Sequence, residues 1–119
     1  MDDHNLQTYD QSHYDGADSF AAKGYIYIPS KCQNGECSVH VAFHGCEQGY
    51  NTIGDKYVRH GGYNEVAEAN DIVVLYPQVD ESSYLPMNPN GCWDWWGYND
   101  SFLQQKFDLK DGAQMKAVM

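Results

Sequence analysis

The sequence predicts an α/β fold built on a small, mainly parallel sheet, and three segments carry this prediction. Residues 38–44 place apolar side chains on one face, as a half-buried strand does. Residues 54–70 have apolar side chains at helical spacing. Residues 72–76 form a continuous apolar run, which is typical of a strand buried on both faces. A strand, a helix and a second strand in this order make a βαβ unit.

Length and composition restrict the class of protein. The chain has 119 residues, enough for one domain or a piece of one. Its hydrophobic content of 42% and aromatic content of 14% exclude a disordered tail. A net charge of −10 disfavours nucleic acids and anionic membrane surfaces as partners, and no run of apolar residues is long enough to span a membrane.

The chain divides into two unequal parts. Residues 1–22 are acidic, and their apolar residues follow no period, so we expect an extended, partly ordered lead-in. Residues 23–119 hold every predicted strand and helix and form the domain proper.

The first predicted strand ends at a proline, Pro29, and is followed by a tight-turn signal. This signal is Asn34-Gly35, which lies between Cys32 and Cys37. We expect this turn to join the strand over 25–29 to the strand over 38–44 in a hairpin, closed by a local Cys32–Cys37 disulfide.

The second half of the domain is richer in loops. Glycines at Gly61-Gly62 break the helix predicted over 54–70. Residues 78–111 are polar and rich in Asn, Pro, Gly and aromatics, and a loop of this length is usually functional. A last helix is expected to begin at Gly112.

Cysteine usage indicates the compartment. The chain has four cysteines and no CxxC pair. An even count together with many Tyr and Trp and few Lys favours two disulfides in an extracellular, secreted protein whose signal peptide is not in this chain.

One short motif has a chemical interpretation. His44-Gly45 follows the strand over 38–44. In α/β-hydrolases such a turn follows the third strand and presents a backbone N–H to the oxyanion. The alternative is a buried structural histidine at the end of a strand.

Longer stretches carry a resemblance to a family. Four stretches occur in the order FHGCEQGY, KYVRHGGYNEVAEANDIVVLYPQ, NPNGCWDWWGY and KDGAQMKAV. In them the chain resembles secreted poly(3-hydroxybutyrate) depolymerases that have a circularly permuted α/β-hydrolase catalytic domain. The resemblance runs from about Tyr25 to Val118. It implies a partial α/β-hydrolase, which is a three-layer sandwich.

The resemblance also implies a reaction. Such enzymes hydrolyse hydroxyalkanoate polyesters or oligoesters with a Ser-His-Asp triad. The triad would lie in the remaining half of the hydrolase domain, which is therefore an expected partner. The residues agree, because no serine of this chain stands in G-x-S-x-G. By the matching motif, the backbone N–H of Cys46 is the expected oxyanion donor.

The side chain of Cys46 is expected to form a disulfide. Strand ends in a parallel sheet are neighbours, so Cys46 should reach Cys92 in the loop after the next strand and close a long loop. Two free buried thiols are the alternative.

The tryptophans near Cys92 are the expected substrate contacts. In a strand-like segment Trp93 and Trp95 would share a face, and Trp96 would take the other. The resemblance implies that Trp95 contacts the polymer. Trp93 and His44 are further substrate-binding candidates, and core packing is the alternative for Trp93 and Trp96.

Neither a metal site nor a cofactor is predicted, because the five histidines lack metal-ligand spacing. Two other functions stay open. A feruloyl or acetylxylan esterase would share parts of the same motifs. An aromatic polymer- or carbohydrate-binding module would have an antiparallel sandwich, against which the buried strand over 72–76 argues.

Overall fold

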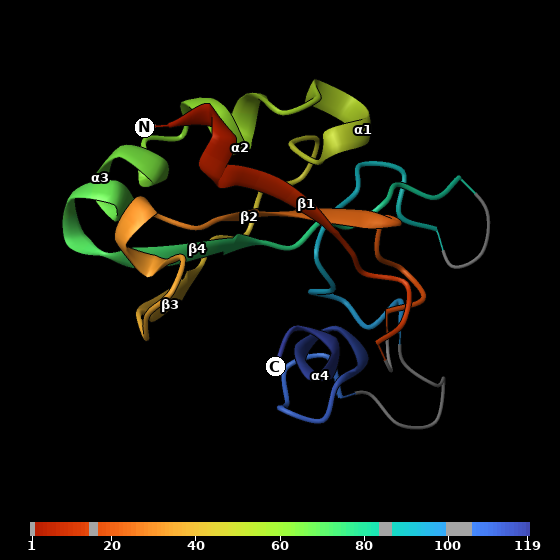
Figure 1. The fold of residues 1–119 in the computed structure, drawn as a ribbon. Helices are drawn as coiled ribbons and strands as arrows, with labels where there is room; N and C mark the ends of the chain where they lie inside the picture. Colours follow the sequence, from red (N-terminus) through yellow and green to blue (C-terminus); the bar gives the residue numbers. More distant parts are fainter. Residues whose placement is uncertain (1, 15–16, 84–86, 100–105) are drawn as a thin grey trace.

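A computed structural model describes residues 2–14, 17–83, 87–99 and 106–119. Its strands lie in one four-stranded sheet, with short helices on either side (Figure 1). The elements are, in chain order, the 3-10 helix η1 (Asp3–Asn5), β1 (Leu6–Asp10), β2 (Lys23–Tyr27), the 3-10 helix η2 (Ser30–Cys32), β3 (Ser38–Val41), α1 (Tyr50–Ile53), α2 (Lys56–His60), α3 (Tyr63–Asn70), β4 (Ile72–Tyr76) and α4 (Ala113–Val118).

The sheet has the order β1-β2-β4-β3 and is mixed. β3 and β4 are adjacent and parallel, as predicted. The pairs β1–β2 and β2–β4 are antiparallel, so the expectation of a mainly parallel sheet is wrong. A parallel pair needs a long crossover. The three helices between β3 and β4 provide one, whereas the described residues between β1 and β2 hold no helix that could carry the chain back.

The predicted hairpin between the first two strands of the domain is also wrong. β4 lies between β2 and β3, and its Val74 pairs with Tyr27 on one side and with His40 on the other. The most continuously apolar strand thus takes a position with a neighbour on both edges, as its composition favours. The local disulfide Cys32–Cys37 forms as predicted, but it closes a loop and not a hairpin.

The helix predicted over 54–70 is broken at the expected glycines. α2 ends at His60 and α3 begins at Tyr63, with Gly62 in the left-handed region at φ 88°. A separate short helix, α1, precedes them, and α4 begins where the last helix was predicted.

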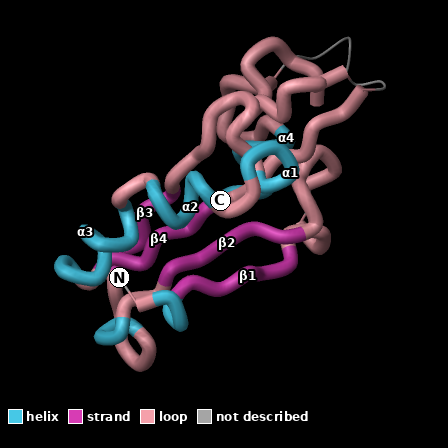
Figure 2. The backbone as a smooth tube through the Cα atoms, turned by 90° about the horizontal axis from the view of Figure 1, so that it is seen from above, coloured by secondary structure: helices cyan, strands magenta, loops and turns pink. Residues whose placement is uncertain are grey.

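Helices α2 and α3 cover one face of the sheet (Figures 1 and 2). Register partners in a sheet point to the same side. Tyr25, Tyr27, Val74 and Tyr76 therefore share this helix-covered face, and Tyr27 and Tyr76 are fully buried there. The hydrophobic core consists of Tyr27, Ala42, Val58, Ala67, Val74 and Tyr76.

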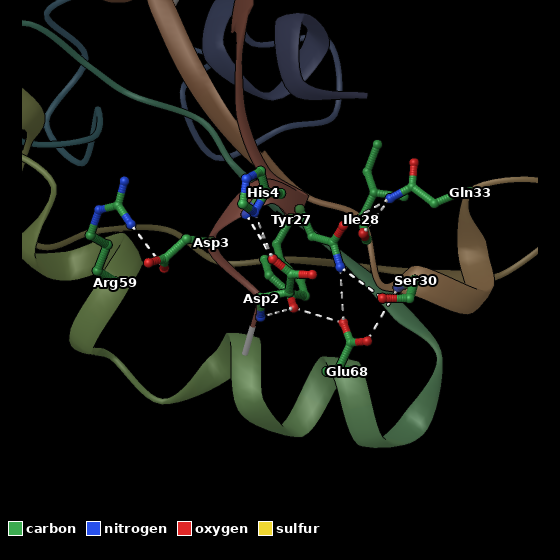
Figure 3. Close-up of polar contacts among 10 residues, drawn as sticks. Asp2, Asp3, His4, Tyr27, Ile28, Ser30, Gln33, Arg59 and Glu68 are labelled. Carbon is green, nitrogen blue, oxygen red and sulfur yellow. Dashed lines mark hydrogen bonds and ion pairs between the residues drawn. The ribbon is translucent and has the colours of Figure 1, made fainter.

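The acidic N-terminal segment lies against the sheet and α3 (Figure 3). β1 pairs with β2 along its whole length. Asn5 Nδ2 donates to Glu68 Oε2 of α3 at 3.4 Å, the Asp2 N–H donates to Tyr27 Oη of β2 at 3.2 Å, and Asp3 pairs with Arg59 of α2 at 3.2 Å. The segment expected to be a partly ordered lead-in therefore supplies an edge strand of the sheet. The division between 1–22 and 23–119 stays a prediction.

Candidate oxyanion turn and aromatic loop

The turn after β3 is held from several sides. The Gly45 N–H donates to Gln48 Oε1 at 2.7 Å, and the Gln48 N–H donates back to the Gly45 carbonyl at 3.2 Å. A Cβ at Gly45 would lie 2.7 Å from Gln48 Oε1, so a larger residue there would displace the side chain that accepts from the Gly45 N–H. The Glu47 N–H donates to the Asn90 carbonyl at 2.6 Å.

Within this turn the N–H of Cys46 differs from its neighbours. It donates no hydrogen bond to any residue that the structure describes, and Cys46 is exposed. An unpaired backbone N–H at the surface of a fixed turn can donate to an oxyanion without first breaking another hydrogen bond. This geometry is compatible with the predicted donor, whose role stays a prediction.

His44 lies behind the turn and is 2% exposed. Its Nε2 accepts from the Val79 N–H at 3.2 Å, so the ring proton is on Nδ1, which donates to the Gly45 carbonyl at 2.8 Å. Burial lowers the pKa of His44, and the hydrogen bond to Gly45 opposes this only in part. The neutral ring thus joins the turn to the segment after β4. Its predicted contact with substrate stays a prediction.

This arrangement predicts a pH dependence of stability. Because the folded pKa of His44 lies below its ordinary value of 6.5, the unfolded chain binds the proton more readily. The free energy of unfolding should hold its full His44 contribution above pH 6.5 and lose it as the pH falls below that value. Urea unfolding between about pH 8 and 5 measures the slope.

In His44→Gln this part of the slope should disappear, whereas the matched surface variant His60→Gln should keep it. Equal slopes in His44→Gln and the parent chain would contradict the assignment of the neutral ring.

The loop that follows β4 is fixed to the turn by a disulfide. Cys46 and Cys92 are bonded, as predicted. Asn88, 1% exposed, stabilises the loop, because its Oδ1 accepts from the Cys92 N–H and its Nδ2 donates to the Cys92 carbonyl, both at 2.9 Å. Sequence reasoning missed Asn88, although Asn88-Pro89 is a turn signal.

The aromatic loop is a turn and not a strand. Asp94 Oδ1 accepts from the backbone N–H groups of Trp96 and Tyr98 at 3.2 and 3.1 Å, and Oδ2 accepts from Asn99 at 3.1 Å. This aspartate bends the chain as Asp does in turns. The expectation that Trp93 and Trp95 share a face is therefore wrong.

The three tryptophans separate into one packed and two exposed rings. Trp93 lies edge-on to Phe43 and Phe20, with ring centroids 5.0 and 5.4 Å apart. Trp95 is 69% exposed and Trp96 37%, and their centroids are 5.0 Å apart. Core packing thus describes Trp93, while Trp95 is free to meet a ligand. Their roles in substrate binding stay predictions.

A second unpredicted residue links this loop to α4. Gln114, 8% exposed, accepts from the Asp94 N–H at 2.6 Å and donates to Tyr98 Oη at 2.6 Å and to Ser19 Oγ at 2.8 Å. Nothing in a lone glutamine on a short helix signals this in the sequence.

The remaining candidate chemistry is absent from the described residues. They contain no group of three or more His, Cys, Asp or Glu that could hold a metal ion. No helix among them is both long and apolar enough to cross a membrane. Ser12 bonds Asp10, and Ser19 accepts from Gln114 and Asn99, so neither serine is paired with a histidine.

A parallel β3–β4 pair with helices between them makes this an α/β protein, and the glycine turn after β3 is a feature that α/β-hydrolases share. Sequence comparison narrows this class. The chain is 38% identical to the "Polyhydroxybutyrate depolymerase" of Talaromyces funiculosus in an alignment that covers 97% of the chain. The chain is also 38% identical to the "Poly(3-hydroxybutyrate) depolymerase" of Delftia acidovorans in an alignment that covers 96% of the chain. No family model matches the chain.

Solved structures agree with the sequence relatives. The crystal structure of the PHB depolymerase from Penicillium funiculosum matches 95% of this chain with a TM-score of 0.85 and 36% sequence identity. A PHB depolymerase complexed with an R3HB trimer matches with a TM-score of 0.82. The chain is therefore a relative of the polyhydroxybutyrate depolymerases, as its motifs predicted.

The match covers only part of these relatives. The chain spans 36% of the Talaromyces protein, 22% of the Delftia protein and 37% of the Penicillium structure. The matched fold is a mixed sheet with short helices, and the complete three-layer sandwich stays a prediction.

Proposed function

We propose that this chain is part of an extracellular polyester depolymerase, a serine esterase, and supplies its oxyanion backbone and part of its substrate cleft. The observation that carries the proposal is the match to a PHB depolymerase crystal structure at a TM-score of 0.85 over 95% of the chain. The Ser-His-Asp triad comes from the remaining half of the hydrolase domain. A serine attacks the ester, and water then releases the acyl group.

In this proposal the turn at Gly45-Cys46 acts electrostatically. The Cys46 N–H stabilises the negative charge that develops on the ester oxygen during attack, and the disulfide to Cys92 holds that donor against the aromatic loop. His44 fixes the turn from behind through Gly45 and Val79.

The proposed substrate is a hydroxyalkanoate polyester or oligoester. Such chains carry carbonyl acceptors and no internal donors, so a flat aromatic surface with few polar groups suits them. The exposed rings of Trp95 and Trp96 lie at 70° to each other, so each offers its own flat apolar face. A structural relative is complexed with an R3HB trimer, which is an oligoester of this kind.

Two further features support the proposal. Two disulfides are typical of secreted proteins and fit an extracellular location. The parallel β3–β4 pair argues against an antiparallel binding module.

Reconstitution tests the proposal. The 119-residue chain is mixed under oxidising conditions with the unmatched remainder of the Talaromyces depolymerase. Ester hydrolysis is followed with nitrophenyl butyrate and with a suspension of polyhydroxybutyrate. Activity in the mixture but in neither chain alone supports the proposal. A folded mixture that hydrolyses neither substrate would overturn it.

In such a reconstituted enzyme, Trp95→Ala should lower the rate on polymer by about tenfold and the rate on nitrophenyl butyrate by less than about twofold. The soluble ester needs the triad and the oxyanion donor but little aromatic surface. The comparison uses initial rates on both substrates. Tyr63→Ala, which removes a half-exposed ring from α3, is the control and should change both rates equally. Equal losses for Trp95→Ala would mark a purely structural tryptophan.

A further inference from the structure

The aromatic loop, residues 92–99, closes around a single carboxylate. Four backbone N–H groups donate to the side chain of Asp94. Those of Trp96, Gly97 and Tyr98 bond Oδ1 at 3.2, 2.5 and 3.1 Å, and that of Asn99 bonds Oδ2 at 3.1 Å. Hydrogen bonds to an ionised acceptor are roughly twice as strong as those between neutral groups. One side chain therefore sets the path of the backbone through this loop.

Asp94 is itself anchored on both sides. Its own N–H donates to Gln114 Oε1 of α4 at 2.6 Å. Two residues earlier, Cys92 is bonded to Cys46 in the turn after β3. Gly97 has φ 94°, a left-handed conformation that glycine adopts without strain, so the sequence permits a tight curl at this point. The carboxylate is therefore a fixed point in a segment that the disulfide holds against the candidate oxyanion donor.

The curled loop presents two tryptophan rings to solvent. Trp95 is 69% exposed and Trp96 37%, and their ring centroids are 5.0 Å apart. Burial of apolar surface is favourable, so indole rings on an unconstrained loop would turn toward apolar side chains. Such side chains are close by, because a hollow of about 250 Å³ beside Asp94 is lined by Phe43 and Met115, among others. A constraint on the backbone is needed to keep the rings exposed, and the bonds to Asp94 supply one.

We infer that Asp94 is a positioning residue for the polyester, because its carboxylate holds Trp95 and Trp96 exposed as a preformed aromatic surface beside the Cys46 N–H. The inference rests on the proposed function, from which it takes the ligand of these rings. Asp94 acts only through the loop backbone and the two rings. Rings that are already in place lose little conformational freedom when a polymer chain binds, so the preformed loop favours binding.

Two substitutions at Asp94 and one matched control test this role. Asp94→Ala removes the acceptor of all four N–H groups. Asp94→Asn keeps the shape and a single oxygen, so it should retain the bonds to that oxygen and lose the charge and the bond to Asn99. Asp108→Ala removes an exposed carboxylate near α4 that bonds no residue that the structure describes. Each effect should therefore be greatest in Asp94→Ala, smaller in Asp94→Asn and absent in Asp108→Ala.

The first measurement reports the arrangement of the rings in the 119-residue chain alone. Two indole rings this close couple their electronic transitions and give a positive and a negative band in far-ultraviolet circular dichroism. Trp95→Phe should abolish this pair of bands and so assigns it. Asp94→Ala should lose most of it, although urea denaturation should show a sheet that is still folded. A pair of bands unchanged in Asp94→Ala would overturn the inference.

The second measurement is adsorption of the oxidised chain to a suspension of polyhydroxybutyrate particles, followed by depletion from the supernatant. Asp94→Ala should raise the apparent Kd about fivefold and Asp94→Asn about twofold. In the background Trp95→Ala/Trp96→Ala, Asp94→Ala should have no further effect, because the aspartate acts only through those rings. Losses that add in this cycle would mark a merely structural aspartate. They would overturn the inference, as would a parent chain that adsorbs no better than the double tryptophan variant.

The reconstituted enzyme separates this inference from the proposed function. There, Asp94→Ala should raise the KM for the polymer about fivefold, with less than about twofold change in kcat and in the rate on nitrophenyl butyrate. Hydrolysis of neither substrate, together with adsorption that depends on Asp94, would reject the proposed function and leave the positioning of the rings standing. Polymer hydrolysis with a KM insensitive to Asp94→Ala would reject the inference alone.

Discussion

The isolated 119-residue chain is expected to hydrolyse no ester. Acyl transfer by the proposed route needs a nucleophile, a base and oxyanion donors. Among the described residues, the backbone N–H of Cys46 is the one group that fits these roles. Loss of the nucleophile alone lowers turnover of a serine hydrolase by roughly a millionfold. Release of nitrophenol from nitrophenyl butyrate by the purified, oxidised chain should therefore equal that of a boiled sample.

The controls for this result address the serines of the N-terminal segment. Ser12 and Ser19 bond to Asp10 and Gln114, so neither has a histidine to accept its proton. Turnover above the boiled sample that survives Ser12→Ala and Ser19→Ala would mean that the catalytic residues lie elsewhere in this chain. Turnover abolished by either substitution would identify a nucleophile that the contacts do not indicate.

Elements with a local cause were predictable from the sequence. The strand over 72–76 is continuously apolar, and the glycines at 61 and 62 break the helix because Gly62 adopts a left-handed conformation. The Cys32–Cys37 disulfide also follows from local spacing. Such features depend on residues close together in the chain.

The order of the strands was not predictable in the same way. Neighbours in the sequence were expected to pair, so β2 and β3 were assigned to a hairpin, yet β4 inserts between them. This pairing depends on which strand would lose most stability if one of its edges were exposed. Segments far apart in the sequence therefore compete for the inner position of the sheet. The pairing of β1 has the same origin, because its short polar pattern gives no strand signal by itself.

The features of the candidate site also divide into those that were predictable from the sequence and those that were not. The turn at Gly45 and the disulfide Cys46–Cys92 follow from motif and topology. Gln114 was missed because it acts through a long-range hydrogen bond to Ser19 that no spacing encodes, whereas Asn88 bonds Cys92 only four residues further on and its turn signal was overlooked. Trp93 and Trp95 were assigned to one face because the hydrogen bonds of Asp94 to the following backbone were not anticipated.

Removal of the Cys46–Cys92 disulfide is expected to lower the free energy of unfolding more than removal of the Cys32–Cys37 disulfide. The bond joins residues 46 apart in sequence. Loop-closure entropy then assigns it roughly 4 kcal/mol, against roughly 2 kcal/mol for a five-residue separation. The double variant Cys46→Ala/Cys92→Ala should lower the free energy of unfolding by about the larger amount, measured by urea denaturation monitored by circular dichroism.

The second disulfide supplies the control, because Cys32 and Cys37 are separated by only 5 residues. Cys32→Ala/Cys37→Ala removes the same number of sulfur atoms, so a shared loss of packing would appear in both variants. The difference between them isolates the constraint that the longer loop places on the unfolded chain. Equal losses, or a greater loss for the shorter loop, would contradict the entropic account. In that case Asn88, which bonds both the N–H and the carbonyl of Cys92, would hold the aromatic loop without the disulfide.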